Sequence, residues 1–286
     1  MRNRLWSIRA NLQVKDHYSG KTVLITGGSS GIGRALARQL VLFGANVLIV
    51  SKNHDKNLDT ENELRQLNKK AKVSSFLCDI GDSNQVEQMG RAVLEKHGAP
   101  DILINNAGFA WYHSFPDMSF LEVISTANVN FVGAVAVTHV FCKAMAEKPG
   151  SQIVMVASIA GALPITPNAV YSAAKRGLHG LSLCLDAELK NAGVDVITVF
   201  PGRVLTPFFD HPSYKNRDAG LETKLVTPIE VIVKHALAGI AKGRKSIFTP
   251  KYWALVSYLY AADPLFFRGL YHWLLSRRLK RLSTRR

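Results

Sequence analysis

Short apolar runs alternate with helix-length segments along most of the chain, and this alternation constrains the fold more than any other feature. Thr22–Thr26 is a β-branched run, and Arg34–Phe43 follows it with apolar residues at helical spacing. Continuous apolar strands separated by helices are typical of parallel sheets covered on both faces. The sequence therefore predicts a single doubly wound α/β domain. Its strands are expected at 22–26, 45–50, 73–77, 102–104, 152–156 and 194–200.

The chain has 286 residues, which is enough for one large α/β domain and short for two. We assign residues 21–250 to that domain, residues 1–20 to an N-terminal arm and residues 251–286 to a C-terminal tail. The formal net charge is +15, yet the central stretch 22–250 holds 23 basic and 19 acidic residues. Most of the charge lies at the two ends. A nearly neutral body without a basic groove motif argues against nucleic acid as a partner.

The cysteines Cys78, Cys142 and Cys184 lie far apart, with no Cys-x-x-Cys pair and no histidine at ligand spacing. We interpret them as reduced core residues and expect no metal site.

A glycine-rich turn, Thr26-Gly-Gly-Ser-Ser-Gly-Ile-Gly33, connects the first expected strand to the first helix. Glycines allow a tight turn and the close approach of backbone to a pyrophosphate. The helix N-terminus offers N–H groups and a positive dipole end to an anion. A purely structural turn is the alternative, but the strand–turn–helix context favours dinucleotide binding. Contacts are expected from Gly27, Ser29, Ser30, Gly31, Ile32 and Gly33.

The end of the second expected strand indicates which dinucleotide is bound. NAD sites usually carry an acidic residue there, which hydrogen-bonds the ribose. This chain has Ser51 at that point and Lys52 next. A hydroxyl and a cation suit a 2′-phosphate, so the sequence predicts NADP(H) as the cofactor. In the alternative interpretation, Lys52 is a solvated surface residue.

Tyr171 and Lys175 stand at positions i and i+4, on one helical face. A phenol normally has a pKa near ~10, and a nearby fixed cation favours the phenolate, so we expect Lys175 to lower the pKa of Tyr171. Ser158 ends an expected strand thirteen residues earlier. The three side chains are therefore expected to converge on one pocket.

These motifs together resemble the short-chain dehydrogenase/reductase family over residues 20–250, which implies a Rossmann fold and an NADP(H)-dependent oxidoreductase. The resemblance implies that Tyr171 exchanges the proton, Ser158 polarises the carbonyl and Lys175 holds the cofactor's ribose. It also implies that Asn130 bends its helix and holds a water molecule for proton relay. Further cofactor contacts are implied for Asp79, Ile80, Asn105, Ala107, Gly108, Pro201, Gly202, Val204 and Thr206.

The tail joins aromatic residues to a basic cluster. Phe266, Leu270, Trp273 and Leu274 form an apolar stripe at helical spacing, followed by basic residues from Arg277 onward. Such a helix suits an anionic membrane surface, and the alternative is a helix that docks on its own domain or on a partner. The predicted location is the cytoplasmic face of a membrane, either endoplasmic reticulum or bacterial inner membrane.

The segment 203–225 mixes aromatic residues, prolines and a glycine, as a substrate-covering loop would. With a membrane tail, it predicts a small lipophilic substrate. Within its family the chain is most similar to 3-ketodihydrosphingosine reductases, on Thr206-Pro-Phe and Leu221-Glu-Thr-Lys-Leu225 among other segments. Steroid, retinoid and fatty-acyl carbonyls remain open, as does a non-catalytic NADP(H)-binding sensor. The resemblance also implies a homo-oligomer.

Overall fold

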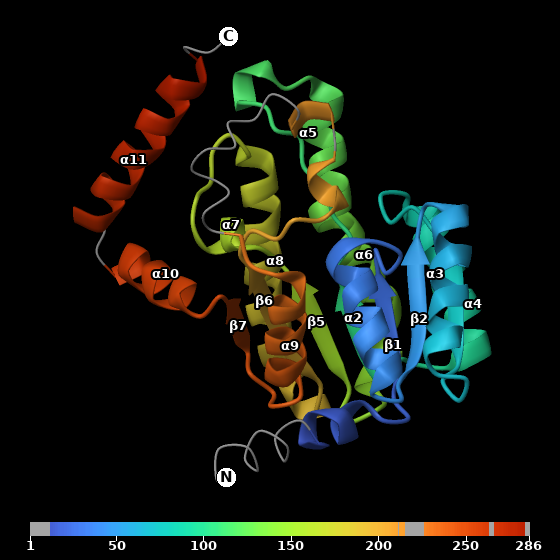
Figure 1. Ribbon diagram of the computed structural model, residues 1–286. Coiled ribbons are helices and arrows are strands. Elements are labelled where there is room, and N and C mark those ends of the chain that lie inside the picture. Colours follow the sequence, from blue (N-terminus) through green and yellow to red (C-terminus); the bar gives the residue numbers. More distant parts are fainter. Residues whose placement is uncertain (1–11, 211, 215–225, 263–265, 284–286) are drawn as a thin grey trace.

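Seven parallel strands form one sheet in the computed structural model, in the order β3-β2-β1-β4-β5-β6-β7 (Figure 1). The structure describes residues 12–210, 212–214, 226–262 and 266–283, without the side chains of 278–283. The order reverses direction between β1 and β4, which confirms the predicted doubly wound sheet. The strands are β1 Thr22–Thr26, β2 Asn46–Ser51, β3 Val73–Leu77, β4 Ile102–Asn105, β5 Gln152–Val156, β6 Asp195–Pro201 and β7 Ser246–Thr249.

Six of these strands match the predicted runs, and β7 is a strand that the sequence did not indicate. It pairs in parallel with β6, with Thr198 opposite Ser246. Only two of its four residues, Ile247 and Phe248, are apolar. A run this short is not distinguishable from a loop by periodicity, and its place at the sheet edge comes from pairing with β6.

Helices cover both faces of the sheet. On one face α2 (Gly31–Leu42), α3 (His54–Leu67) and α9 (Ile229–Ile240) contribute buried residues to a core with β1, β2 and β6. On the other face α4 (Ser83–His97), α6 (Gly133–Ala146) and α8 (Ala169–Glu188) pack around Leu103, Ile153 and Phe141. The shorter helices are α5 (Phe120–Ala127) and α7 (Ile159–Ala162). Single helical turns lie at Phe115–Asp117, Lys190–Ala192, Pro207–Phe209 and Pro212–Tyr214.

The boundary predicted after residue 20 is wrong for the described part of the N-terminal segment. Residues 12–18 are helical, and Val14 and Tyr18 belong to the core cluster that includes α2 and α9. The Tyr18 hydroxyl donates a hydrogen bond to the carbonyl oxygen of Leu237 at 2.8 Å. Burial of this tyrosine joins the segment to the domain, although its flanking polar residues gave no sign of it. Residues 1–11 of the predicted N-terminal arm lie outside the described residues.

The stretch Phe120–Ala146 is, within the described residues, one helix long and apolar enough to cross a membrane. Its α6 part buries Val137, Phe141 and Met145 against the sheet, as a core helix of a domain does. A turn of π-helix, Asn128–Val132, separates α5 from α6 within this stretch. Asn130, at which the family resemblance implies a bend, lies in this π-helical turn.

Two helices follow β7 and extend from the domain, α10 (Tyr252–Ala262) and α11 (Phe266–Ser283) (Figure 1). α10 contacts β7, and α11 contacts α10.

Candidate active site

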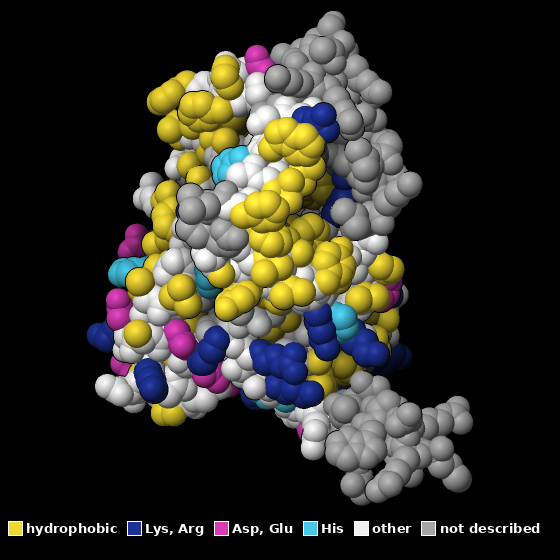
Figure 2. Space-filling model, turned by 90° about the vertical axis from the view of Figure 1, so that its left-hand side faces the viewer, with side chains coloured by type: hydrophobic (Ala, Val, Ile, Leu, Met, Phe, Trp, Pro, Cys, Tyr) yellow, Lys and Arg dark blue, Asp and Glu magenta, His cyan; other side chains and the backbone are white. Residues whose placement is uncertain are grey.

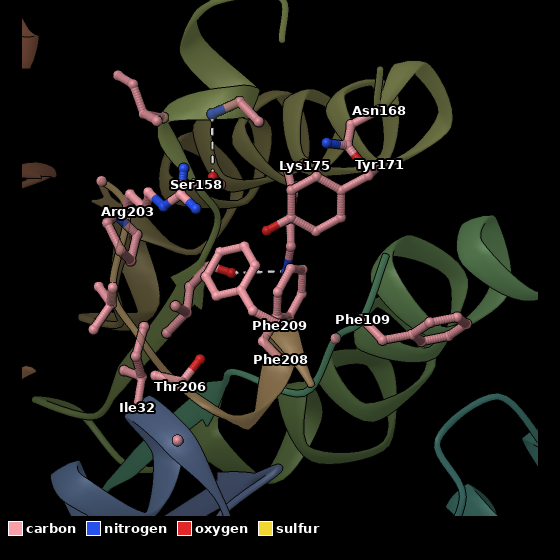
Figure 3. A pocket seen from close by; sticks show the side chains of 18 of the residues that line it. Ile32, Phe109, Ser158, Asn168, Tyr171, Lys175, Arg203, Thr206, Phe208 and Phe209 are labelled. Atoms are coloured by element: carbon pink, nitrogen blue, oxygen red, sulfur yellow. Dashed lines mark hydrogen bonds between the residues drawn. The ribbon is translucent and has the colours of Figure 1, made fainter. Parts of the chain in front are cut away.

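A cavity of about 880 Å³ opens where the carboxyl ends of the central strands meet. Residues that follow β1, β4, β5 and β6 line it, together with the start of α8 (Figure 3). It includes the point where the strand order reverses, which is where ligands bind in open α/β sheets.

The glycine-rich turn forms one end of this cavity, where Ser30, Gly31 and Ile32 contribute to the lining. Gly27 has φ +65°, and a Cβ atom there would lie 2.9 Å from Cα of Ala107. At Gly33 a Cβ atom would lie 2.2 Å from the carbonyl oxygen of Gly27. Any side chain at either position would force these segments apart. The turn therefore has the shape of a cradle that lets a phosphate approach the backbone and the N-terminus of α2.

The threonine before the turn fixes its position relative to β4. Oγ1 of Thr26 accepts hydrogen bonds from the backbone N–H groups of Asn106 at 3.0 Å and Ala107 at 3.1 Å. The Asn106 side chain also donates to the carbonyl oxygen of Thr26. Asn106 lines the cavity although the sequence analysis did not select it.

Ser51 and Lys52, which were predicted to contact the 2′-phosphate of NADP(H), do not face the cavity. Oγ of Ser51 accepts from Oγ of Ser29 at 2.8 Å. Lys52 is 70% exposed, and its Nζ lies 3.6 Å from a carboxylate oxygen of Asp79. Neither Ser51 nor Lys52 lines the cavity, whereas Lys56 of α3 does. Lys56 was not predicted, because sequence spacing does not show that this residue of α3 faces the cavity.

Several other predicted cofactor residues are not among those that line the cavity. Asp79 is partly exposed and accepts a hydrogen bond from the backbone N–H of Gly81, whereas Ile80 is buried. Asn105 is also buried, and its amide donates to the Thr138 hydroxyl at 2.8 Å. Ser29 and Gly33 are likewise outside the lining.

The proposed catalytic side chains converge as expected. Tyr171 and Lys175 lie on successive turns of α8, and Ser158 follows β5 at the start of α7; all three line the cavity (Figure 3). Ser158 and Tyr171 are joined by a side-chain hydrogen bond. Nζ of Lys175 lies 5.8 Å from the centre of the Tyr171 ring. A substrate carbonyl at Tyr171 and Ser158 would thus meet two hydroxyl donors.

The predicted effect of Lys175 on Tyr171 is wrong for the protein without cofactor. Burial raises the pKa of Tyr171 to about 12, and the hydrogen bond with Ser158 opposes this rise. Burial also lowers the pKa of Lys175 to about 8. Nζ of Lys175 is directed to the carbonyl oxygen of Val156, to which it donates at 3.0 Å. Desolvation of the phenolate therefore outweighs the nearby cation.

Asn130 lies in the π-helical turn and is fully buried. Its amide nitrogen donates to the carbonyl oxygens of Phe109 at 2.6 Å and Thr126 at 2.9 Å. Its Oδ1 has no hydrogen-bond partner among the described residues. A Cβ atom on Gly108 would lie 2.5 Å from this oxygen and 3.2 Å from Nζ of Lys175. The absence of a side chain at Gly108 thus leaves space beside both groups.

Comparisons with known proteins agree with this geometry. The sequence pattern of the short chain dehydrogenase family matches residues 21–216. The chain belongs to the short-chain dehydrogenase/reductase family. It is therefore an oxidoreductase of a family whose solved structures include complexes with NADPH and with NAD.

The chain is similar in sequence to several oxidoreductases. It is 32% identical to the 3-ketodihydrosphingosine reductase of Bos taurus, over 75% of this chain and 65% of that protein. It is 32% identical to human 15-hydroxyprostaglandin dehydrogenase [NAD(+)], over 68% of this chain and 72% of that one. An uncharacterized oxidoreductase of Staphylococcus epidermidis is also 32% identical, over 69% of this chain and 84% of that protein. The chain thus spans less than two thirds of the cattle reductase.

Solved structures show the same fold. A short-chain dehydrogenase from Sphingobium yanoikuyae in complex with NADPH has a TM-score of 0.74 at 23% identity, covering 90% of this chain and 95% of that one. A short-chain dehydrogenase/reductase from Burkholderia phymatum in complex with NAD has a TM-score of 0.76 at 24% identity, covering 86% of this chain and 95% of that one.

The substrate side of this short-chain dehydrogenase is rich in aromatic residues. Pro201, Gly202, Val204 and Thr206, for which the family resemblance implies cofactor contacts, line the cavity. The ring of Phe208 lies 5.7 Å from that of Tyr171, centre to centre. Phe209, Tyr112 and Tyr214 extend the aromatic wall. The predicted substrate loop thus contributes through its first residues, while 211 and 215–225 lie outside the described residues.

The C-terminal helices also reach this cavity, which was not predicted from the sequence. Trp253 of α10 and Leu274 and Arg277 of α11 are lining residues. The Tyr271 hydroxyl donates to the carbonyl oxygen of Pro164 at 2.9 Å. These contacts agree with the alternative in which the tail docks on its own domain. No sequence signal could have located them, because apolar and basic residues of a tail suit a membrane equally well.

Within the described residues no group of three or more His, Cys, Asp or Glu side chains could hold a metal ion.

Proposed function

We propose that this short-chain dehydrogenase/reductase is an NADPH-dependent reductase of a lipophilic ketone. The observation that carries this proposal is the meeting of Tyr171, Ser158 and Lys175 with an aromatic wall in one cavity. The polar groups suit a carbonyl oxygen, and the aromatic wall suits an apolar chain or ring.

The proton steps follow from the positions of the side chains. The Tyr171 hydroxyl donates a proton to the carbonyl oxygen, and its raised pKa keeps it protonated at neutral pH. Ser158 donates a hydrogen bond to the same oxygen, where negative charge develops. Lys175 would hold the ribose of the cofactor, and its positive charge would stabilise the Tyr171 phenolate until the phenol is reprotonated. The bound nicotinamide cofactor supplies the hydride.

Asn130 and Gly108 support a route for the proton. The unpartnered Oδ1 of Asn130 and Nζ of Lys175 border the space left at Gly108. A water molecule there would accept from Lys175 and donate to Asn130, which satisfies the buried oxygen. Such a water would pass a proton to Lys175 and so allow Tyr171 to be reprotonated after each turnover.

The preference for NADP(H) is supported by charge. Lys56 lines the cavity beside the glycine-rich turn, and the described lining residues include no Asp or Glu. Asp79, the carboxylate nearest in sequence to the third strand's end, is paired with Lys52. A 2′-phosphate would thus meet a lysine and no carboxylate.

The substrate class rests on similarity and on the cavity. The 32% identity to a 3-ketodihydrosphingosine reductase makes 3-ketodihydrosphingosine a first candidate for reduction to dihydrosphingosine. Steroid, retinoid and fatty-acyl ketones fit the same aromatic wall. The 15-hydroxyprostaglandin dehydrogenases supply a reason to test the oxidative direction as well.

The tail supports attachment to a membrane surface. Phe266, Leu270 and Trp273 are exposed on α11, and Leu255 and Tyr258 are exposed on α10. Figure 2 shows hydrophobic side chains gathered on the side of the molecule that faces the viewer. With the basic residues that follow in sequence, this surface suits an anionic bilayer. The proposed location is the cytoplasmic face of endoplasmic reticulum or bacterial inner membrane, where lipophilic ketones partition.

A homo-oligomer would use the helices that short-chain dehydrogenases share. Val132 beside α6 and Leu183 on α8 are large and exposed, which suits burial against a second copy.

A substrate panel tests the proposal. Purified protein with NADPH is given 3-ketodihydrosphingosine, a steroid ketone, a retinoid and an acyl ketone in mixed micelles, and NADPH oxidation is followed. Turnover of at least one ketone is expected. NADPH binding without turnover of any panel member would instead favour a non-catalytic sensor.

A further inference from the structure

The first C-terminal helix, α10, contributes Trp253 to the cavity wall beside the turn that follows β6. A Cβ atom on Gly202 would lie 3.1 Å from Nε1 of Trp253 and 3.2 Å from Cδ of Pro250. Trp253 therefore packs directly on the turn that follows β6. Since β7 pairs with β6, the sheet itself fixes where α10 begins.

The second C-terminal helix closes the outer part of the same cavity. Tyr271, which hydrogen-bonds Pro164, is followed by Leu274 and Arg277 at steps of three residues. This spacing keeps the three side chains near one face of α11. Leu274 and Arg277 line the cavity. Because Arg277 is exposed, it stands at the cavity mouth.

The charges in this cavity have one sign. The described lining residues include four cationic side chains and no carboxylate. Lys56 lies with the glycine-rich turn and Lys175 with Tyr171, so both belong to the cofactor and catalytic parts. Arg203 and Arg277 are on the substrate side, where each guanidinium lies over an aromatic ring, 5.3 Å from the centre of Phe209 and 4.1 Å from that of Trp273.

An arginine held on an aromatic ring presents its planar fork in a restricted orientation. That fork matches a carboxylate with two parallel hydrogen bonds. A substrate with a cationic group would be repelled by the same surroundings. We infer that α10 and α11 complete the substrate site and that Arg277 binds a carboxylate on the substrate, so that the ketone is an oxo-acid with a long apolar chain.

This inference rests on the proposed reductase and selects among its substrates. It places acidic acyl ketones ahead of amine-bearing sphingoid ketones. Arg277 is then a specificity-determining residue supplied by the tail. The tail would thus bind substrate as well as attach the protein to a membrane.

Binding of unreactive ligands tests the site without relying on turnover. Isothermal titration of the full chain with NADPH compares dodecanoate with dodecanol, in the wild type and in Arg277→Gln. Arg268→Gln is the matched control, since Arg268 lies on the same helix over the Tyr260 ring and is not a lining residue. We expect dodecanoate to bind about tenfold more tightly than dodecanol in the wild type and control, a difference that one charge-assisted pair supplies. Arg277→Gln should remove this difference and leave dodecanol binding unchanged.

Three results would overturn the inference. They are equal affinity for acid and alcohol in the wild type, an acid preference that survives Arg277→Gln, and non-competitive inhibition of ketone reduction by dodecanoate, which would place the acid outside the cavity. The reductase is tested separately with the neutral ketone 2-tridecanone. Its turnover without any acid preference would reject the role of Arg277 and keep the reductase. An acid preference without turnover of any ketone would keep the role of Arg277 and reject the reductase.

Discussion

Nζ of Lys175 lies 5.8 Å from the centre of the Tyr171 ring, yet the two groups are shifted in opposite directions by the same burial. The pKa of Tyr171 rises to about 12 and that of Lys175 falls to about 8. Near neutral pH the pair therefore consists of a neutral phenol and a cation. In this state the phenol carries the proton that ketone reduction requires.

The pH dependence of catalysis should follow Lys175. As pH rises through about 8, Lys175 loses its proton while Tyr171 keeps its own, so kcat/KM for NADPH should fall above that pH. This parameter reports groups of the free enzyme. In Lys175→Arg the cation persists, and the fall should move to higher pH. A fall near pH 8 that is unchanged in Lys175→Arg would assign it to another group.

The same shifts predict how stability depends on pH. Between pH 8 and 10.5 the folded Lys175 binds fewer protons than the unfolded one, so its contribution to the free energy of unfolding rises with pH there. Below pH 8 the cost of burying the charge is present in full. Urea denaturation of wild type and Lys175→Met across this window would measure the difference, and parallel curves for the two proteins would contradict it.

Cofactor preference should depend on Lys56. Lys56→Gln should weaken NADPH binding about tenfold and leave NADH binding unchanged, because only NADPH carries the 2′-phosphate. Lys52→Gln is the control and should change little, since Lys52 is exposed and paired with Asp79. Fluorescence titration of the wild type and the two variants with both cofactors measures the six dissociation constants. Weaker NADPH binding in Lys52→Gln but not in Lys56→Gln would show that Lys52 turns toward the cofactor when it binds.

Asn130 should matter for both stability and catalysis. Asn130→Ala removes the donor for two backbone carbonyl oxygens and should lower the free energy of unfolding by about 2 kcal/mol. Asn57→Ala is a matched control, because the Asn57 amide also bonds two backbone carbonyl oxygens, of Ser51 and Phe76. Both variants should lose similar stability in urea denaturation, whereas only Asn130→Ala should lose kcat. Equal kcat in the two variants would leave Asn130 a structural residue.

The exposed apolar face of α11 should carry membrane binding. Phe266→Glu and Trp273→Glu place charges on residues that are 69% and 49% exposed, so the fold should tolerate them. Both should release the protein from anionic vesicles in a sedimentation assay. Leu42→Glu adds the same charge at an exposed leucine of α2 and should sediment like wild type. Release by all three variants would indicate a general charge effect and contradict a role for the tail.

The sequence was informative wherever structure depends on local pattern. Apolar periodicity located six strands, and the glycine spacing located the turn where Gly27 and Gly33 leave no room for side chains. Tyr171, Lys175 and Ser158 were identifiable because their spacing places them at the end of one strand and the start of one helix.

Interactions between distant segments were not predictable in this way. The pairing of Lys52 with Asp79 and the exposure of Lys56 to the cavity depend on how α3 packs beside β3. The burial of Tyr18 depends on α9, more than two hundred residues later. The upward shift of the Tyr171 pKa depends on desolvation, which sequence spacing does not measure.

Ketone reduction by the wild type and by Tyr171→Phe tests the central claim most directly. The variant keeps the ring that packs near Phe208 and loses only the hydroxyl. NADPH oxidation is measured with the best ketone of the substrate panel, and NADPH binding is measured in parallel. We predict unchanged binding and a loss of turnover by a factor of about 100 to 10,000, the range for removal of a general acid. Turnover in Tyr171→Phe within twofold of wild type would contradict the role of Tyr171 as proton donor.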